Sequence, residues 1–264
     1  MIVTTSYNPN EDMKKRAVTI AEIVNGIYVE RVKQSLSKIF VANQKAQIIV
    51  VEKERSKYLY RDQEQSFFFH PSMALLRINR LKQGDNDLMV QIAGLKKGDY
   101  FLDCTLGLAT DSIVASFVAG SSGKVVGIES QSVIAALVKD GLIRGWPSDY
   151  DIDQSMKRIE IKLDNHIDYL KTLPNKSFDI VYFDPMFRYG LHQSSSINPI
   201  RDIANQKPLT EETVEEAKRI AKRKVILKEN IASSEFERLG FIPFPRSVRS
   251  VTFGVINLDE DEYN

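Results

Sequence analysis

The chain is built from short apolar runs that alternate with amphipathic segments, and the alternation becomes regular from about residue 86. The apolar runs predict strands, and the segments with apolar residues every three or four positions predict helices. In this region the expected strands are 100–103, 124–128, 158–163, 178–183, 224–227, 241–243 and 250–257. The expected helices are 111–119, 131–143, 166–173, 211–222 and 233–239. Strands that alternate with helices are typical of a mostly parallel sheet covered on both faces.

The last two expected strands follow each other without a helix between them. Strands joined by a short connection pair antiparallel, so these two predict a hairpin at the C-terminal edge of the sheet. The expected fold is therefore α/β, with a Rossmann-like, seven-stranded sheet that is mostly parallel and ends in this hairpin.

The N-terminal quarter shows a shorter pattern of its own. We expect a strand at 2–5, a helix at 11–24, a second helix near 32–40 and a strand at 46–51. A further helix is expected from Ser72 to about Lys82. These elements predict a small N-terminal α/β domain over residues 1–65, followed by a larger domain over residues 66–264.

The composition excludes several classes of protein. The chain has 264 residues, of which 43% are hydrophobic and 27% charged, as in ordinary globular proteins. Cys104 is its only cysteine, so no disulfide forms within the chain, and three scattered histidines argue against a metal site. No apolar run is long enough to span a bilayer, and the polar residues that follow Met1–Ser6 do not fit a signal peptide. We therefore expect a cytoplasmic protein without membrane or metal partners.

The charge is unevenly distributed along the chain. Net charge is only +1, but residues 1–82 hold 14 basic against 8 acidic residues, whereas the remainder holds 22 against 27. A basic N-terminal third beside an acidic remainder fits a phosphate-binding module joined to a catalytic domain. On charge alone, a solvated surface explains the same numbers equally well.

Two motifs indicate a nucleoside cofactor. The first, Asp103-Cys-Thr-Leu-Gly107-Leu-Ala-Thr-Asp111, lies between a strand and a helix, where Gly107 lets a ligand approach the backbone. An ordinary structural turn would also explain it, since Ala109 stands where a second glycine is expected. The second is Glu129, 26 positions after Asp103 at the end of the next strand, where a carboxylate can accept hydrogen bonds from ribose hydroxyls. Alone it is equally a helix cap, but together the two favour an adenosine-containing cofactor.

A third motif, Asp164-Asn165, ends the third strand of the larger domain. A carboxylate at this place can accept a hydrogen bond from the amino group of an adenine. The alternative is a polar cap for the helix that begins at His166, and the residues alone do not decide between them.

The most informative motif is Asp184-Pro185-Met186-Phe187, directly after the apolar strand 178–183. It resembles the (Asp/Asn)-Pro-Pro-(Tyr/Phe) motif of amino-group methyltransferases. An exocyclic amine of a nucleobase is a poor nucleophile because its lone pair is delocalised into the ring. A carboxylate that accepts its N–H bonds favours the pyramidal nitrogen, Pro185 stiffens the turn, and Phe187 can stack on a base. We therefore expect Asp184, Pro185 and Phe187 to act in catalysis, chiefly by positioning the amine.

Taken together, the sequence resembles the small-subunit ribosomal RNA guanine-N2 methyltransferases, the J-type enzymes. The resemblance extends from about residue 67 to the C-terminus and weakens after residue 190. Besides the motifs at Asp103–Asp111 and Asp184–Phe187, it is carried by three stretches, Phe69-His-Pro-Ser-Met-Ala74, Gly127-Ile-Glu-Ser130 and Val133-Ile-Ala-Ala-Leu137.

This resemblance implies a class I methyltransferase sheet, S-adenosylmethionine as methyl donor and S-adenosylhomocysteine as product. It also implies transfer to a guanine 2-amino group of 16S RNA, and hence a role in rRNA processing with RNA or the small ribosomal subunit as partner. The positions implied for the cofactor contacts are Asp103, Gly107, Thr110, Asp111, Glu129, Ser130, Asp164, Asn165 and Asp184, the last lying between cofactor and substrate.

The sequence departs from the family at three places. Ala109 and Thr110 replace the usual glycine and arginine, and Arg188 replaces a proline. These changes leave other hypotheses open. One is a methyltransferase for DNA, another RNA or a small amine. Another is a non-catalytic RNA-binding or ribosome-assembly protein that keeps the fold. A nicotinamide-dependent dehydrogenase fits less well, because the full glycine fingerprint is missing.

Overall fold

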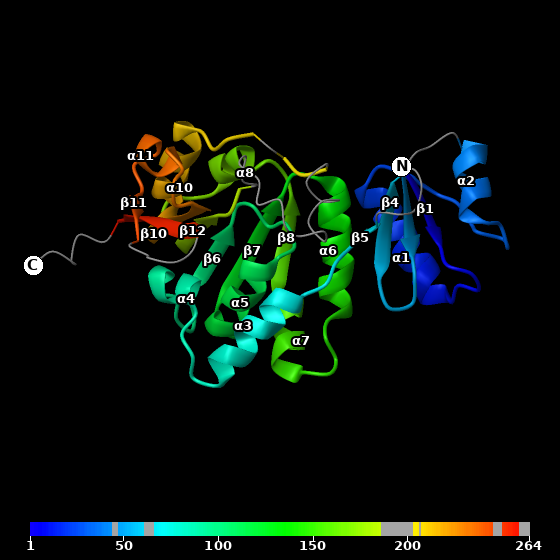
Figure 1. The fold of residues 1–264 in the computed structure, drawn as a ribbon, viewed down its shortest axis with the longest axis horizontal. Coiled ribbons are helices and arrows are strands. Elements are labelled where there is room, and N and C mark those ends of the chain that lie inside the picture. The colour runs from blue at the N-terminus through cyan, green and yellow to red at the C-terminus, as the bar shows by residue number, and fades with distance from the viewer. Residues whose placement is uncertain (44–46, 61–65, 186–202, 206, 245–249, 259–264) are drawn as a thin grey trace, which may run out of the picture. The chain divides into compact units, whose positions relative to one another are not determined.

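The computed structural model describes residues 1–43, 47–60, 66–185, 203–205, 207–244 and 250–258 (Figure 1). Their contacts divide them into two compact units. The first contains the described residues within 1–70, together with 131–144 and 203–204, and the second contains the rest. A domain boundary near residue 65 stays a prediction.

The second unit is built on a seven-stranded sheet. Its strands are β6 (Tyr100–Asp103), β7 (Lys124–Glu129), β8 (Ile159–Leu163), β9 (Phe178–Phe183), β10 (Ala221–Asn230), β11 (Ile242–Pro243) and β12 (Val251–Asn257). They lie in the order β11-β12-β10-β9-β6-β7-β8. β12 pairs antiparallel with both β10 and β11, and the other pairs are parallel. The predicted seven-stranded sheet with its antiparallel C-terminal edge is thus confirmed.

The direction of the strand order changes between β6 and β9. From β6 the chain adds β7 and β8 on one side, and it then continues with β9 and β10 on the other. The two central strands pair in parallel, with Leu102 opposite Val181 and Asp103 opposite Tyr182. In open α/β sheets, ligands bind at the carboxyl ends of the strands beside such a change of direction. This edge is therefore where a site is expected.

Two groups of helices pack against this sheet. The first consists of α3 (Ser72–Lys82), α4 (Leu88–Ala93), α5 (Thr110–Ala119) and α7 (Tyr150–Lys157), and α5 contacts the other three as well as β6, β7 and β8. The second consists of α8 (His166–Thr172), α10 (Glu211–Ile220) and α11 (Glu235–Arg238). One apolar cluster joins this second group to the sheet, and it includes Leu102, Val126, Val181, Val225, Leu170, Val214 and Phe236. Burial of this cluster is the main stabilising term of the unit.

The first unit is a smaller five-stranded sheet with helices. Its strands are β1 (Ile2–Thr5), β2 (Ile27–Tyr28), β3 (Gln47–Val51), β4 (Ser56–Tyr60) and β5 (Ser66–Phe68), in the order β2-β1-β3-β4-β5. β1 pairs in parallel with β2 and β3, whereas β3, β4 and β5 pair antiparallel. The helices are α1 (Glu11–Ile23), α2 (Leu36–Asn43) and α6 (Ser132–Arg144). α1 contacts β1, β3 and α6, so a helix distant in sequence completes this unit.

Some predicted elements need correction. The helix expected near 32–40 begins only at Leu36, because Val32 and Lys33 have positive φ angles that a right-handed helix does not allow. The elements that sequence patterning missed are β2, β4, β5, α4 and α7. They are short, and the eight residues of α7 are mostly polar, so each offers few apolar positions from which a pattern can be recognised.

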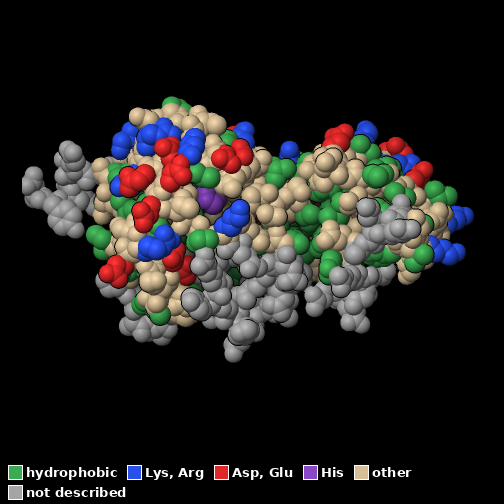
Figure 2. All heavy atoms as spheres, turned by 90° about the horizontal axis from the view of Figure 1, so that it is seen from above, with side chains coloured by type: hydrophobic (Ala, Val, Ile, Leu, Met, Phe, Trp, Pro, Cys, Tyr) green, Lys and Arg blue, Asp and Glu red, His purple; other side chains and the backbone are tan. Residues whose placement is uncertain are grey.

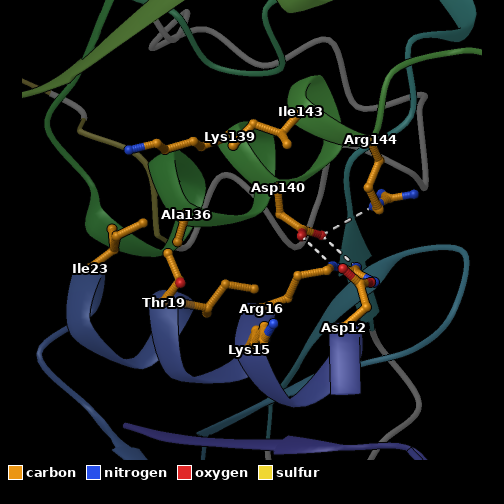
Figure 3. A pocket seen from close by; sticks show the side chains of 11 residues that line it. Asp12, Lys15, Arg16, Thr19, Ile23, Ala136, Lys139, Asp140, Ile143 and Arg144 are labelled. Carbon is orange, nitrogen blue, oxygen red and sulfur yellow. Dashed lines mark hydrogen bonds and ion pairs between the residues drawn. The ribbon is translucent and has the colours of Figure 1, made fainter. Parts of the chain in front are cut away.

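Within the first unit, α1 and α6 border a groove of about 380 Å³ (Figure 3). Its polar side is closed by an ion pair in which Arg16 donates from Nε and Nη2 to the two oxygens of Asp140, at 2.8 and 2.9 Å. The Asp140 side chain is only 6% exposed and also accepts a hydrogen bond from the Ser56 hydroxyl at 2.8 Å. This carboxylate therefore joins α6 to α1 and β4.

In the part of the chain that the structure describes, no helix is both long and apolar enough to cross a membrane.

Replacing Asp140 with alanine should destabilise the protein by about 3–5 kcal/mol, because it leaves the largely buried Arg16 guanidinium with only the exposed Asp12 carboxylate, at 3.6 Å, as counter-charge. Urea unfolding of wild type and Asp140→Ala would measure this difference. Glu11→Ala is the control, because it removes an exposed ion pair with Lys14 and should change the stability little. Equal losses in the two variants would contradict the role assigned to Asp140.

Candidate functional site

The turn after β6 has an open backbone that is suited to a ligand. Gly107 adopts a φ of +48°, and among the described residues other than its chain neighbours the atom nearest to an added Cβ would be the Thr105 carbonyl oxygen, at 3.8 Å. Its N–H donates to Glu129 Oε2 at 3.2 Å, which joins this turn to the end of β7. The sequence-predicted pair Gly107 and Glu129 is thus brought together at the carboxyl edge of the sheet.

The same turn is held closely against β7. A Cβ on Gly127 would lie 2.3 Å from Leu106 Cδ1, so only glycine lets the turn pack this closely. Ala109 takes a φ of +57° at the N-terminus of α5, a left-handed conformation that is costly for any residue but glycine. Ala109 therefore adopts a conformation that glycine would adopt at lower cost, and Thr110 follows as the first residue of the helix.

The Asp103 side chain stabilises this turn by hydrogen bonds. Its carboxylate is buried and accepts hydrogen bonds from the Thr105 N–H at 3.0 Å and the Ser112 hydroxyl at 2.7 Å. Burial raises the pKa of Asp103 to about 7, although these hydrogen bonds favour the ionised form. Its contacts fix the shape of the turn.

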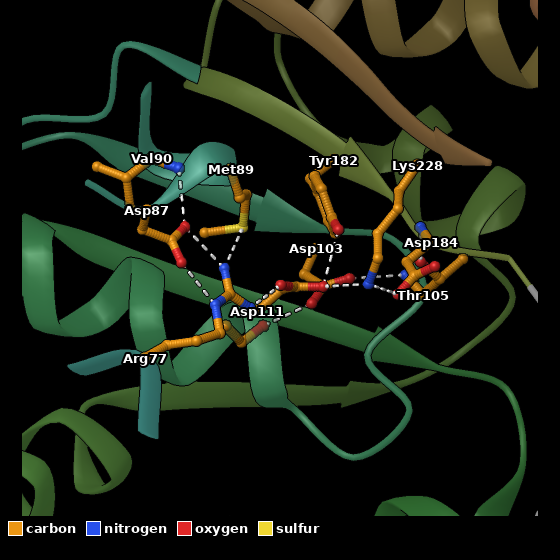
Figure 4. Close-up of polar contacts among 11 residues, drawn as sticks. Arg77, Asp87, Met89, Val90, Asp103, Thr105, Asp111, Tyr182, Asp184 and Lys228 are labelled. Atoms are coloured by element: carbon orange, nitrogen blue, oxygen red, sulfur yellow. Dashed lines mark hydrogen bonds and ion pairs between the residues drawn. The ribbon is translucent and has the colours of Figure 1, made fainter. Parts of the chain in front are cut away.

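Asp111 lies at the centre of a buried ionic cluster (Figure 4). It accepts hydrogen bonds from the Tyr182 hydroxyl at 2.8 Å, from Lys228 Nζ at 3.2 Å and from the Arg77 guanidinium. Arg77 also makes a bidentate contact with Asp87, at 2.7 and 2.9 Å. Burial would raise the pKa of Asp111, but the charges of Lys228 and Arg77 hold it well below its usual range.

Asp184 lies at the other end of this cluster. Its carboxylate accepts from Lys228 Nζ at 2.6 Å, and its backbone N–H donates to Thr105 Oγ1 at 2.5 Å. Burial lowers the pKa of a lysine, yet the Asp111 and Asp184 carboxylates outweigh this and raise the pKa of Lys228. Lys228 is therefore a firmly charged ammonium between two carboxylates.

The motif at the end of β8 lies next along the edge. The Asp164 N–H donates to the Glu129 carbonyl oxygen at 3.1 Å, and Asp164 is exposed. Asn165 accepts from the Ile167 N–H at 3.2 Å and caps α8, as the structural interpretation of this motif anticipates. The structure thus shows the capping role of Asn165, and a cofactor contact by Asp164 and Asn165 stays a prediction.

The remaining predicted positions divide into two groups. Ser130 follows β7 directly and is half-buried, and Pro185 follows Asp184 after β9. Phe187, to which the sequence assigns base stacking, lies outside the described residues together with Met186.

Sequence reasoning missed Arg77, Thr105, Tyr182 and Lys228. Arg77 belongs to an amphipathic helix, where an arginine ordinarily faces solvent. Lys228 directly follows the apolar run 225–227, at the same edge of the sheet as the predicted carboxylates. The position of this lysine directly after the predicted strand 224–227 was the available signal for a site residue. Among the described residues, no group of histidine, cysteine or acidic side chains is arranged to hold a metal ion.

Comparisons with known proteins were made by sequence and by structure. Residues 31–235 match the profile of a family described as "Putative SAM-dependent methyltransferase". The chain is 40% identical over 256 residues to the uncharacterised protein YpiP of Bacillus subtilis, covering 97% of this chain and 98% of that one. Its structure aligns with the SAM-dependent methyltransferase NGO1261 of Neisseria gonorrhoeae with a TM-score of 0.66 at 16% identity, covering 97% and 96% of the two chains.

More distant sequence relatives carry a more specific name. The chain is 32% identical over 149 residues to the ribosomal RNA small subunit methyltransferase J of Buchnera aphidicola. It is 39% identical over 106 residues to the protein of the same name from Coxiella burnetii. These alignments cover 54% and 39% of this chain, and 58% and 39% of the two relatives.

The raised pKa of Asp103 predicts a pH-dependent loss of stability. Between the ordinary value of 3.8 and about 7, the folded protein holds a proton on this group that the unfolded chain has released. The free energy of unfolding should therefore fall as pH rises through this window, by on the order of 4 kcal/mol from this group. Urea unfolding between pH 4 and 8 should show Asp103→Asn gaining stability relative to wild type as the pH rises. A constant difference between the two proteins would refute the assignment.

Proposed function

The chain belongs to the family of SAM-dependent methyltransferases, and on that premise we propose that it methylates an exocyclic amine, the 2-amino group of a guanine in 16S ribosomal RNA. The observation that carries this proposal is the position of Asp184. Its carboxylate follows β9 at the point where the strand order changes direction, beside the turn that follows β6. The names of the Buchnera and Coxiella relatives support the choice of RNA as acceptor.

The methyl donor is S-adenosylmethionine, which supplies a methyl group bonded to a positively charged sulfur. The open backbone at Gly107 lets a ligand approach it closely, because nothing in the described residues fills the space a Cβ would take. In the proposed arrangement Glu129 accepts hydrogen bonds from the ribose hydroxyls, and Asp164 and Asn165 lie near the adenine. Asp103, Thr110 and Ser130 complete the wall of this site.

The retained turn bears on the non-catalytic alternative. That hypothesis rests on the loss of the usual glycine at Ala109 and the usual arginine at Thr110. Because Ala109 keeps the left-handed backbone, the turn remains shaped for a cofactor despite the substitution. We therefore favour an enzyme over a fold retained only for RNA binding.

In the proposed reaction, Asp184 accepts an N–H of the amine and orients its lone pair toward the methyl group. Positive charge develops on the amine nitrogen during transfer, and a fixed carboxylate beside it stabilises that charge. The proton that the methylated amine loses then passes to Asp184. Pro185 limits the motion of the turn, and Phe187 is the proposed stacking partner of the base.

The acceptor RNA needs attractive charge from some part of the protein. Figure 2 shows acidic and basic side chains interspersed over the described part of one face. The excess of basic residues lies within residues 1–82, which include the segment proposed as a separate N-terminal module. We propose that this module contributes phosphate contacts, so that RNA binding should weaken as salt concentration rises.

The acceptor is tested by transfer of labelled methyl from S-adenosylmethionine to 16S RNA that lacks its methylations. Wild type should label this RNA, and Asp184→Asn should lower the rate by at least about 100-fold, the loss typical of a missing transition-state contact. Asp179→Asn is the matched control, since Asp179 lies on the same strand at its opposite end and accepts a hydrogen bond from the Tyr100 N–H. Parallel assays on assembled small subunits, DNA and a small amine complete the experiment. Activity on the small amine alone would overturn the RNA proposal.

The cofactor role of Glu129 is tested by calorimetry with S-adenosylhomocysteine. Glu129→Ala should weaken binding by about 1–3 kcal/mol, the range for hydrogen bonds to a charged group. Glu160→Ala, on the neighbouring strand β8, should bind as wild type does because Glu160 pairs with Lys162 and Lys124 instead. Unchanged affinity in Glu129→Ala would remove Glu129 from the proposed cofactor site.

A further inference from the structure

We propose that Lys228 is a positioning residue for Asp184. Lys228 holds one oxygen of the Asp184 carboxylate so that the other oxygen meets the acceptor amine. This inference rests on the proposed function, since it assigns Asp184 the contact with the amine. It names the residues by which the chain fixes that contact.

Both parts of Asp184 are held by neighbouring groups. The backbone is fixed by its N–H bond to Thr105 Oγ1, and the side chain by the 2.6 Å contact of Oδ2 with Lys228 Nζ. Among the described residues, Oδ1 has no hydrogen-bond donor. A carboxylate with one oxygen bound and the other open is oriented to accept a single N–H from a ligand.

Lys228 is itself held in place by a chain of alternating charges. It contacts Asp111, which the Arg77 guanidinium and the Tyr182 hydroxyl also hold, and Arg77 is clamped by Asp87. The sequence of contacts is thus Asp87, Arg77, Asp111, Lys228 and Asp184 (Figure 4). Because a lysine loses much side-chain freedom when it is fixed in this way, it needs several partners to stay in one position.

The residues at the Asp184 end are the most exposed members of this chain, since Asp87 and Arg77 at the other end are 11% and 19% exposed. The Asp111 side chain is 7% exposed, whereas those of Lys228 and Asp184 are 26% and 25% exposed. Buried ion pairs add little stability over apolar residues of the same shape, so stability alone is a weak explanation for this cluster. A chain of charges whose most buried member, Asp111, holds the lysine that contacts a partly exposed carboxylate fits a device for orienting that carboxylate.

The pKa of Asp184 is raised by its surroundings as a whole, and Lys228 opposes this rise. Burial raises the pKa of Asp184, the Lys228 ammonium lowers it, and the Asp111 carboxylate raises it. Arg77 adds a more distant positive charge, while Asp103 from β6, Tyr182 from β9 and Glu229 from β10 face the same region. Lys228 is the nearest cation, so its removal should raise the pKa of Asp184 further.

The test compares Lys228→Met with Lys228→Arg, and with Lys224→Met as matched control. Lys224 lies four residues earlier on the same strand and donates to the Ile92 carbonyl oxygen. On methyl transfer to 16S RNA, Lys228→Met should lower kcat by about 10–100-fold, as expected for a misplaced reacting group, with KM for RNA little changed. As the pH is lowered, kcat/KM of this variant should begin to fall at a higher pH than that of wild type, because the pKa of Asp184 is higher. Lys228→Arg should recover part of the loss, and Lys224→Met should behave as wild type.

A double-mutant cycle separates positioning from a general structural role. In the Asp184→Asn background, Lys228→Met should cost less than about 3-fold, because the group it acts through is already changed. Equal costs in the two backgrounds, or a KM effect without a kcat effect, would overturn the inference. Calorimetry with S-adenosylhomocysteine on each variant confirms that the fold and cofactor site are retained.

A second measurement does not depend on the acceptor. The Asp184 carboxyl pKa can be followed by carbon NMR of labelled aspartate, assigned with Asp184→Asn, and it should be higher in Lys228→Met than in wild type. An unchanged pKa would refute the inference even if 16S RNA proves to be the wrong substrate. Wild type that shows this coupling but does not label the RNA would overturn only the proposed function.

Discussion

The parallel pairing of β6 with β9 is the constraint on which the site depends. It joins strands that are more than seventy residues apart in the chain and places Asp103 opposite Tyr182. The ladder continues past the strand ends, first through the Cys104 N–H on the Tyr182 carbonyl oxygen at 2.9 Å. The next bond, from the Asp184 N–H, is accepted by the Thr105 side chain instead of a backbone carbonyl. One hydroxyl thus couples the turn proposed for the cofactor to the residue proposed for the acceptor.

This coupling explains why the charged cluster lies where it does. Asp111 is the second residue of α5, directly after the turn, and Tyr182 lies on β9 two residues before Asp184, so both are fixed by the same strand pairing. Two carboxylates brought this close repel each other unless a cation stands between them. Lys228, from the next strand outward, supplies that cation, and Arg77 balances the far side of Asp111. The cluster follows from the topology of the sheet as well as from its proposed chemistry.

The sequence was sufficient for the sheet because its strands are marked by local composition. The run Phe178–Phe183 is apolar except for Asp179 and bounded by polar residues, and its observed limits match the predicted ones. The order of the strands came instead from resemblance to a known fold, because pairing partners far apart leave no periodic signal. Elements such as β4 and α7 escaped prediction because their identity depends on the neighbours against which they pack.

For the site, the sequence indicated the acidic residues and missed the basic ones. Acidic residues at strand ends stand out because burial there needs a reason, as with Asp103 and Asp184. Arg77 was hidden because an arginine on an amphipathic helix is ordinarily solvated, and only the tertiary fold turns it toward Asp87 and Asp111. The local sequence pattern therefore could not predict the basic residues that contact each carboxylate, although these contacts determine its charge and orientation.

The two acidic residues at the central strand ends show what this difference in contacts means for function. Asp103 is held by a hydroxyl and a backbone N–H without a contacting cation, and its pKa of about 7 leaves it easily protonated. Asp184 is in direct contact with a firmly charged lysine through Oδ2, and none of the described residues donates to its Oδ1. Burial raises the pKa of Asp184 as well, but the Lys228 ammonium opposes this rise and orients the carboxylate. A residue that must stabilise positive charge on an amine benefits from such a cation, and of the two carboxylates Asp184 is the one in contact with it. Asp103 is suited to the opposite task of keeping a tight turn closed.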